Sequence, residues 1–235
     1  MAKPAQQLEG DPAVLDVLHE ASARWFREAF QAPTRAQTEA WPAIAEGKNT
    51  LLLAPTGSGK TLAAFLVAID HIMFGVQRSS TQDGRPHEKV RVLYISPLKA
   101  LGVDVERNLR APLVGVRSVA DREGIEYHEP TIGVRSGDTP TVERHRLTRH
   151  PPDILITTPE SLYLMLTSRA RAALAEVETV IIDEIHSVAS TKRGSHLFFS
   201  LERLEDLRQS NGMKTPLQRI GLSATQRPLD EIARL

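Results

Sequence analysis

A glycine-rich turn that ends in Lys-Thr is the first feature of the sequence that could do chemistry. APTGSGKT occupies residues 54–61, after the β-rich run TLLLA at 50–54 and before a helix-like stretch at 61–74. Glycines let backbone N–H groups point inward around a phosphate, and the N-terminus of the following helix adds partial positive charge. Lys60 can bridge β- and γ-phosphates, and the Thr61 hydroxyl can be a ligand of Mg²⁺. The predicted nucleotide-binding residues of this turn are Thr56, Gly57, Ser58, Gly59, Lys60 and Thr61.

One position of this turn departs from the strict P-loop pattern G-x-x-x-x-G-K-[ST]. Ala54 stands where that pattern has its first glycine. A tight strand-to-helix turn without a ligand is therefore the alternative interpretation of residues 54–61.

Two adjacent carboxylates supply the second half of a nucleotide-hydrolysing site. The apolar run 179–183 ends in Asp183, and Glu184 follows it within the stretch VIIDEIH at 180–186. Asp183 can hold Mg²⁺, directly or through water, and Glu184 can orient and deprotonate an attacking water. Two acids after a buried strand can also be a solvated strand end, but the P-loop upstream favours the catalytic interpretation. His186 is ambiguous in isolation, since a lone histidine is most often a satisfied polar residue.

The elements that must position these residues alternate along the chain. Strand-like and helix-like segments that alternate favour an α/β fold with a mostly parallel central sheet and helices on both faces. An exposed polar loop is expected at 75–89. The predicted strands are 50–54, 90–96, 131–135, 153–158, 179–183 and 219–223. The predicted helices are about 12–30, 37–45, 61–74, about 98–110, 141–149, 160–174 and 195–208.

Composition excludes several classes of protein. Lys+Arg and Asp+Glu both number 29 in 235 residues, so attraction of the whole molecule to a polyanion is not indicated and any such binding needs local basic clusters. The absence of cysteine excludes disulfides and thiolate metal sites. The N-terminus has no continuous apolar segment of a secretory signal, and the apolar stretch 62–74 is too short to span a membrane. These observations predict a cytoplasmic protein without a membrane partner.

Taken in order, three segments resemble the motifs of the superfamily 2 helicases. Residues 54–61, the sequence DEIH at 183–186 and the sequence SAT at 223–225 resemble motifs I, II and III. The stretch FQAPTRAQ at 30–37 resembles the Q motif, which implies that Gln37 recognises adenine and that Phe30 stacks on the base.

Three further segments resemble the nucleic-acid motifs Ia, Ic and Ib of that superfamily. They are SPLKAL at 96–101, RSGDT at 135–139 and TTPESL at 157–162, and together they look most like the large helicase-related (Lhr) subgroup. Ser96-Pro97 and Thr158-Pro159 each read as a capping residue followed by proline at the first helical position, and exposed helix N-termini bind backbone phosphates. Lys99 and Arg135 could add positive charge there, as could Arg144, Arg146 and Arg149. The alternatives are ordinary helix caps for the two capped turns and a solvated helix face for the last three arginines. The resemblance implies nucleic-acid contacts at Pro97, Lys99, Arg135, Gly137, Asp138, Thr158, Pro159 and Glu160.

The resemblance also implies a fold, a division of the chain and an activity. It implies an N-terminal helical extension at 1–30 and a first RecA-like, ATP-binding helicase domain at 31–235, with the second RecA-like domain absent from these residues. ATP and Mg²⁺ are the expected cofactors, with Thr61 and Asp183 as metal ligands. Lys60, Asp183, Glu184 and His186 form the expected catalytic set, and His186, Ser223 and Thr225 are expected to couple nucleotide state to the nucleic-acid surface.

The activity implied by the resemblance is ATP-driven 3′-to-5′ movement on single-stranded DNA, with unwinding of DNA or RNA:DNA duplexes in DNA repair. The 235 residues alone are expected to hydrolyse ATP slowly or not at all. A GTPase switch is disfavoured because no Asn-Lys-x-Asp stretch occurs, and a non-catalytic binding module because Lys60, Asp183 and Glu184 are all present. An RNA helicase of the Ski2-like or DEAH type remains the serious alternative.

Overall fold

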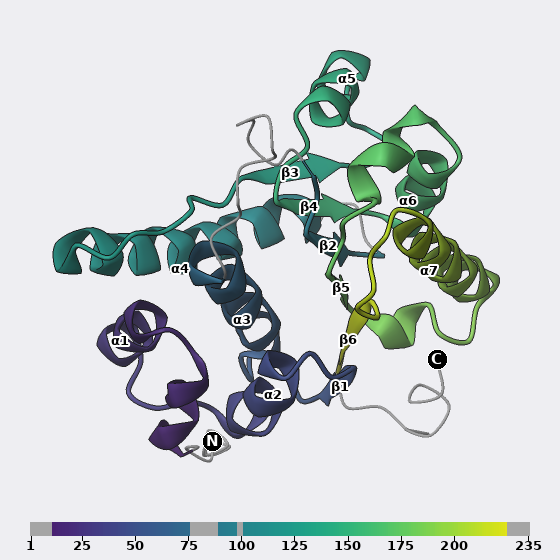
Figure 1. The fold of residues 1–235 in the computed structure, drawn as a ribbon. Coiled ribbons are helices and arrows are strands. Elements are labelled where there is room, and N and C mark those ends of the chain that lie inside the picture. Colours follow the sequence, from purple (N-terminus) through teal and green to yellow (C-terminus); the bar gives the residue numbers. More distant parts are fainter. Residues whose placement is uncertain (1–10, 76–88, 98–100, 225–235) are drawn as a thin grey trace.

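A single sheet of six parallel strands forms the centre of the molecule. The computed structural model describes residues 11–75, 89–97 and 101–224 (Figure 1). Neighbouring strands pair in the order β1-β6-β5-β2-β4-β3, all in parallel register. All six predicted strands are confirmed. They are β1 (Thr50–Leu53), β2 (Val92–Ile95), β3 (Ile132–Arg135), β4 (Ile154–Thr157), β5 (Thr179–Ile182) and β6 (Gln218–Ser223).

The central strands are apolar throughout because both of their faces are covered. Successive side chains of a strand point to opposite faces of the sheet. In β2, Val92 and Tyr94 contribute to one core, and Leu93 and Ile95 contribute to the other. A continuous run of apolar residues is therefore the pattern expected of a buried parallel strand, and the predicted α/β class with helices on both faces is confirmed.

Helices from the first half of the chain cover one face of the sheet, and helices from the second half cover the other (Figure 1). The first core contains residues of η1, α1, α2, α3 and α4, and the second contains residues of α6, η2 and α7. The short helix α5 contacts the edge strand β3. The helical elements are η1 (Pro12–Val17), α1 (Glu20–Ala29), α2 (Arg35–Ala45), α3 (Lys60–Phe74), α4 (Leu101–Glu123), α5 (Thr141–Arg149), α6 (Pro159–Leu166), η2 (Arg169–Leu174), η3 (Ile185–Ser187) and α7 (Lys192–Ser210).

The N-terminal helix predicted over about 12–30 is wrong as a single element. It divides into η1 and α1, because Leu18 has extended backbone angles and His19 caps the second helix by accepting a hydrogen bond from the Ala21 N–H at 3.3 Å. The His19 N–H also donates to Asp70 Oδ1 on α3 at 3.0 Å. Burial raises the pKa of Asp70. The turn between the two helices is thus fixed by a contact with the main body of the domain.

The helix predicted over about 98–110 continues to Glu123 in the structure, past a proline, a residue that ordinarily ends or kinks a helix. Pro112 lies inside α4, and Gly115 follows within the next turn. A Cβ atom on Gly115 would lie 1.9 Å from the indole nitrogen of Trp25, so the glycine allows α1 to pack closely against α4. Tertiary packing therefore outweighs the local breaking signal.

Four other helix predictions differ from the structure in their boundaries: those at 37–45 and 61–74 begin at Arg35 and Lys60, and the differences at 160–174 and 195–208 are larger. The predicted helix 160–174 divides at Thr167 and Ser168 into α6 and η2, since Ser168 accepts a hydrogen bond from the Ala170 N–H and so begins a new turn. The helix predicted from 195 begins at Lys192, where Thr191 caps it through the Gly194 N–H. Capping side chains set these last two boundaries.

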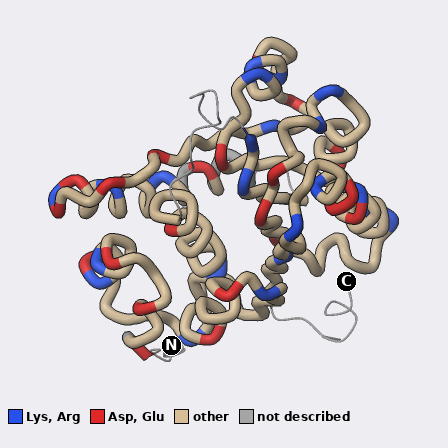
Figure 2. The backbone as a smooth tube through the Cα atoms, viewed as in Figure 1, with Lys and Arg blue, Asp and Glu red and all other residues tan. Residues whose placement is uncertain are grey.

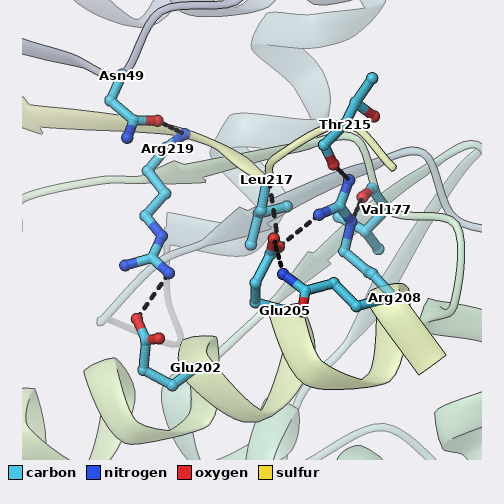
Figure 3. Close-up of polar contacts among 9 residues, drawn as sticks. Asn49, Val177, Glu202, Glu205, Arg208, Thr215, Leu217 and Arg219 are labelled. Carbon is cyan, nitrogen blue, oxygen red and sulfur yellow. Dashed lines mark hydrogen bonds and ion pairs between the residues drawn. The ribbon is translucent and has the colours of Figure 1, made fainter. Parts of the chain in front are cut away.

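Arg208 is a fully buried arginine that ties the end of α7 to the start of β5 (Figure 3). Its guanidinium donates to the carbonyl oxygens of Val177 and Thr215, the latter at 2.9 Å, and to the Glu205 carboxylate. Glu205 also accepts a hydrogen bond from the Leu217 N–H at 3.2 Å. Although burial opposes its ionisation, hydrogen bonds from Gln209 and Arg208 lower the pKa of Glu205. The cluster therefore fixes the turn that leads into β6.

Charged residues of both signs are distributed over most elements (Figure 2). Many of them form exposed ion pairs such as Arg117–Glu129 and Arg122–Glu28, both at 2.6 Å. Within the described ranges, none of the helices has the length and apolar character needed to cross a bilayer.

Candidate nucleotide site and nucleic-acid edge

The carboxyl ends of all six strands meet at one edge of the sheet, because every neighbouring pair is parallel. The strand order divides this edge into two halves. Residues 54–61 follow β1, Ser223 ends β6 and Asp183 follows β5, so the predicted nucleotide residues share one half. The segments that resemble nucleic-acid motifs follow β2, β4 and β3, so they share the other half (Figure 1).

The backbone of the turn 54–61 needs glycine at two of its positions. Gly57 and Gly59 have φ angles of 82° and 81°, and a Cβ atom on Gly59 would lie 2.6 Å from the Gln37 side-chain nitrogen. Among the described non-glycine residues only Glu184 has a positive φ, so Ala54 lies outside the left-handed region. The first position of the motif therefore accepts alanine without backbone strain.

Lys60 lies buried at the start of α3, with its ammonium group against the turn. Its Nζ donates to the carbonyl oxygens of Ala54 and Pro55, the latter at 2.8 Å. An ammonium has three donors, so one remains for a phosphate oxygen. Burial lowers the pKa of Lys60, while the carboxylates of Glu184 and Asp183 act in the opposite direction. In the part of the chain that the structure describes, the buried Ser58 hydroxyl oxygen has no hydrogen-bond partner, as expected of a cradle shaped for a polar ligand.

The segment 30–37 lies directly against the turn and lines a cavity with it. Gln37 Oε1 accepts a hydrogen bond from the Thr34 N–H at 2.9 Å, and its Nε2 donates to the Gly59 carbonyl at 3.5 Å. The Thr34 hydroxyl donates to the Ser58 carbonyl at 2.8 Å. The cavity has a volume of about 400 Å³, and Phe30, with 42% of its surface exposed, is one of its walls. The structure thus brings both residues predicted to bind adenine next to the predicted phosphate site.

Asp183 has both carboxylate oxygens hydrogen-bonded. Oδ1 accepts from the Glu184 N–H at 2.9 Å, and Oδ2 accepts from the Tyr94 hydroxyl. Burial is the main cause that raises the pKa of Tyr94, and the charge of Asp183 adds to it. Tyr94 was not among the residues that the sequence predicts for the site. The signal that could have found it is the hydroxyl in the otherwise apolar run VLYI of a central strand, because that hydroxyl must find a partner.

Glu184, His186 and Ser223 form a connected chain of polar contacts. Glu184 has φ 45° and ψ 41°, a left-handed conformation that places it at the start of η3. His186 Nε2 lies 3.3 Å from Glu184 Oε2, and His186 Nδ1 lies 3.0 Å from the Ser223 hydroxyl. The first contact is an ion pair when His186 is protonated, and the direction of the second depends on the histidine tautomer. The contacts expected for the coupling residues are present for His186 and Ser223, and Thr225 lies outside the described residues.

The residues present suit a magnesium ion held partly by a nucleotide. No group of three or more His, Cys, Asp or Glu side chains within 11–75, 89–97 and 101–224 could form a metal cage. Mg²⁺ is usually held by one or two protein oxygens together with phosphates and waters, and Asp183 and Thr61 provide such oxygens. The role of Thr61 and Asp183 as metal ligands stays a prediction.

On the other half of the edge, the cap expected at Thr158-Pro159 is confirmed. The Thr158 side chain accepts a hydrogen bond from the Ser161 N–H at 3.3 Å, and Pro159 is the first residue of α6. Glu160 is exposed, and its carboxylate pairs with Arg193 of α7, with Oε2 3.1 Å from Nη2. Pro97 is buried just after β2, whereas Lys99 lies outside the described residues.

Arg144 organises the loop that contains Gly137 and Asp138. Its Nε donates to the Thr139 carbonyl at 2.7 Å, and its Nη2 donates to the carbonyls of Gly137 and, at 3.5 Å, Ser136. A solvated helix face is therefore the wrong interpretation for Arg144, although Arg146 is exposed and pairs with Glu143. Burial, followed by the charge of Arg144, lowers the pKa of Arg135 at the start of the same loop.

Comparisons with known proteins agree with these features. Residues 34–232 match the sequence profile of the DEAD/DEAH box helicase family. The chain is 60% identical over 210 residues to the Lhr helicase/probable uracil glycosylase of Mycolicibacterium smegmatis, covering 89% of this chain and 13% of that protein. It is 53% identical over 225 residues to the Lhr helicase/uracil glycosylase of Escherichia coli, covering 95% of this chain and 14% of that protein.

A solved structure shows the same arrangement of elements. The Mycobacterium smegmatis helicase Lhr, bound to single-stranded DNA and AMP-PNP, has a TM-score of 0.84 and 56% identity over 96% of this chain and 27% of that one. The chain thus spans only about an eighth to a quarter of the length of these relatives. The predicted RecA-like fold is confirmed by this likeness and by the parallel sheet. The matched profile and the order of the motifs show that this chain belongs to the DEAD/DEAH box helicase family, and the identities show that it is similar to the Lhr helicases within it.

Proposed function

We propose that this chain is the first motor domain of an ATP-dependent helicase or translocase. In this proposal ATP hydrolysis drives 3′-to-5′ movement on single-stranded DNA and unwinding of DNA or RNA:DNA duplexes, with a role in DNA repair. The observation that carries the proposal is the division of one sheet edge into a nucleotide half and a nucleic-acid half. Two ligand sites on one rigid sheet are what coupling between hydrolysis and strand movement requires.

The residues of the nucleotide half have distinct roles in this proposal. Gln37 and Phe30 hold the adenine, while the backbone of 56–59 and the Lys60 ammonium hold the phosphates. Glu184 orients the attacking water and accepts its proton. Bound Mg²⁺ supplies charge neutralisation at the phosphate oxygens, and Asp183 and Thr61 are the residues that would hold it. The chain Glu184–His186–Ser223 links the base to the neighbouring strand β6.

The relatives support the choice of ATP as the nucleotide and of single-stranded DNA as the nucleic acid in this proposal. The Mycobacterium smegmatis relative is described as bound to single-stranded DNA and to AMP-PNP, a nucleotide with the form of ATP. Because this chain spans a small part of that protein, a second RecA-like domain is the proposed partner that completes the motor. Polarity, duplex substrates and the role in repair are carried by family resemblance.

The decisive measurement is ATP hydrolysis by the full-length protein with single-stranded DNA, with RNA of the same sequence, and with neither. We expect stimulation by DNA to exceed stimulation by RNA at least several-fold. Stimulation by RNA alone, or equal stimulation by both, would assign the protein to the RNA helicases instead. The 235-residue fragment serves as the control and should show little hydrolysis under any of the three conditions.

Arg144 provides a test of the nucleic-acid half. Arg144→Ala removes the donors that hold the carbonyls of Gly137 and Thr139, so the loop loses the conformation that faces a strand. Because hydrogen bonds to charged groups contribute about 1.5–3 kcal/mol, we expect single-stranded DNA to bind about 10-fold more weakly. Fluorescence anisotropy with a labelled oligonucleotide measures this affinity, and AMP-PNP affinity should stay unchanged.

The matched control for this variant is Arg146→Ala. Arg146 lies on the same helix and carries the same charge, but it pairs with Glu143 rather than with the loop. Its loss should change DNA affinity less than about twofold, in line with a screened surface charge. Equal weakening by both substitutions would mean that net charge, and not loop geometry, governs binding.

A further inference from the structure

Tyr94 occupies a position where its ring and its hydroxyl serve different contacts. It is fully buried in β2, and its ring stacks on Phe65 of α3, with centroids 4.8 Å apart and planes 24° from parallel. Phenylalanine would fill this place equally well, and a buried hydroxyl costs free energy unless it is hydrogen-bonded. The hydroxyl donates to Oδ2 of Asp183, so its presence is explained by that one carboxylate.

Strand β2, which carries Tyr94, holds both the main chain and the side chain of Asp183. The Asp183 main-chain N–H donates to the Ile95 carbonyl at 2.9 Å, which extends the β2–β5 ladder by one step. The side chain is then fixed from both sides, because the Glu184 N–H occupies Oδ1 and the Tyr94 hydroxyl occupies Oδ2. Each carboxylate oxygen keeps a further lone pair for another ligand.

We propose that Tyr94 is a positioning residue for the Asp183 carboxylate in nucleotide hydrolysis. This inference rests on the proposed function, in which Asp183 holds Mg²⁺ against the phosphates. Groups that hydrogen-bond to a metal-binding side chain fix its orientation, and their loss commonly weakens metal binding by about 10–100-fold. Tyr94 does not contact the nucleotide in this role; it acts through Asp183 alone.

The position of Tyr94 in the sheet is a second argument for this role. β2 lies beside β5 in the sheet, and its carboxyl end leads directly into Ser96-Pro97, the first segment of the nucleic-acid half. The same short strand therefore orients a predicted metal ligand and begins a predicted strand contact. The Tyr94 hydroxyl therefore fixes the Asp183 carboxylate relative to the strand that leads into Ser96-Pro97.

The test is Tyr94→Phe in the full-length protein, which removes the hydroxyl and keeps the ring on Phe65. Isothermal titration should measure AMP-PNP affinity over a range of Mg²⁺ concentrations and in EDTA. We expect affinity in EDTA to change less than twofold, and the Mg²⁺ concentration for half-maximal binding to rise about 10-fold. The KM for the magnesium complex of ATP should rise by a similar factor, because weaker Mg²⁺ binding to the complex weakens binding of the magnesium nucleotide to the same extent.

Tyr163→Phe is the control, because Tyr163 lies on α6 and makes ring contacts with His196 and Arg203 on the far side of the sheet. It should leave the Mg²⁺ requirement and this KM as in the wild type. An unchanged Mg²⁺ requirement in Tyr94→Phe, with active wild-type protein, would overturn the role of Tyr94 and leave the proposed function intact. A uniform loss of affinity with and without Mg²⁺ would show a packing role and also overturn it. Absence of Mg²⁺-dependent nucleotide binding by the wild type would overturn both proposals.

Discussion

Glu184→Gln is expected to abolish ATP hydrolysis while leaving ATP binding intact. A positioned general base contributes about 10²–10⁴-fold to a rate, and a glutamine amide cannot accept the proton of the attacking water. The side chain keeps its size, so the contact with His186 Nε2, 3.3 Å from Glu184 Oε2, can be kept by the glutamine amide. The loss should therefore appear in kcat, measured as DNA-stimulated phosphate release.

The backbone at this position makes glutamine the right substitution. Glu184 has φ 45° and ψ 41°, a conformation that costs a non-glycine residue of order 1–3 kcal/mol and that glutamine adopts at the same cost. AMP-PNP affinity should thus change less than about threefold. Glu129→Gln, at an exposed ion pair with Arg117, is the matched control and should keep full turnover. Turnover retained by Glu184→Gln would refute the assignment of the base.

Arg208→Met is expected to cause the largest loss of stability among the substitutions considered. The guanidinium is fully buried and donates to two carbonyl oxygens and to Glu205. The substitution leaves the Val177 and Thr215 carbonyls without this donor and the half-buried Glu205 without its counter-ion, so we expect a loss of about 3–5 kcal/mol. Urea denaturation followed by circular dichroism measures this loss in the free energy of unfolding.

Two further variants separate the cause of this loss. In Arg208→Met/Glu205→Leu the orphaned carboxylate is removed as well, so part of the stability should return. Lys192→Met deletes a charge of the same sign from the exposed start of the same helix and should change stability by less than about 0.5 kcal/mol. If the double variant is no more stable than the single one, the Glu205 carboxylate is not the source of the penalty.

The strands were predictable from sequence because burial on both faces leaves a direct trace in composition. Each predicted run overlaps one observed strand, and helix 141–149 is predicted with the bounds that the structure shows. Helix ends were less predictable. Pro112 lies inside α4 because α1 packs on Gly115, and this contact joins residues about 90 positions apart.

The residues of the candidate site likewise include some that were predictable from sequence and some that were not. The turn 54–61 and the acids 183–184 were predictable because each has its chemistry in adjacent residues. Tyr94 and Arg144 were not, since their partners lie on another strand or in the preceding loop and only the fold brings them together. The roles predicted for Lys99 and Thr225 concern residues outside the described ranges and stay predictions.

The order of the strands has a mechanical consequence. The nucleotide half and the nucleic-acid half of the edge meet at the β5–β2 pair, which is in register over four residues and extended by the Asp183–Ile95 hydrogen bond. Within the sheet, a load between a phosphate and a bound strand would cross this ladder. A close-packed interior transmits strain instead of absorbing it, so the sheet would move as one rigid unit. The compliance that a motor stroke needs would then reside in the loops at the carboxyl edge and in joints between domains.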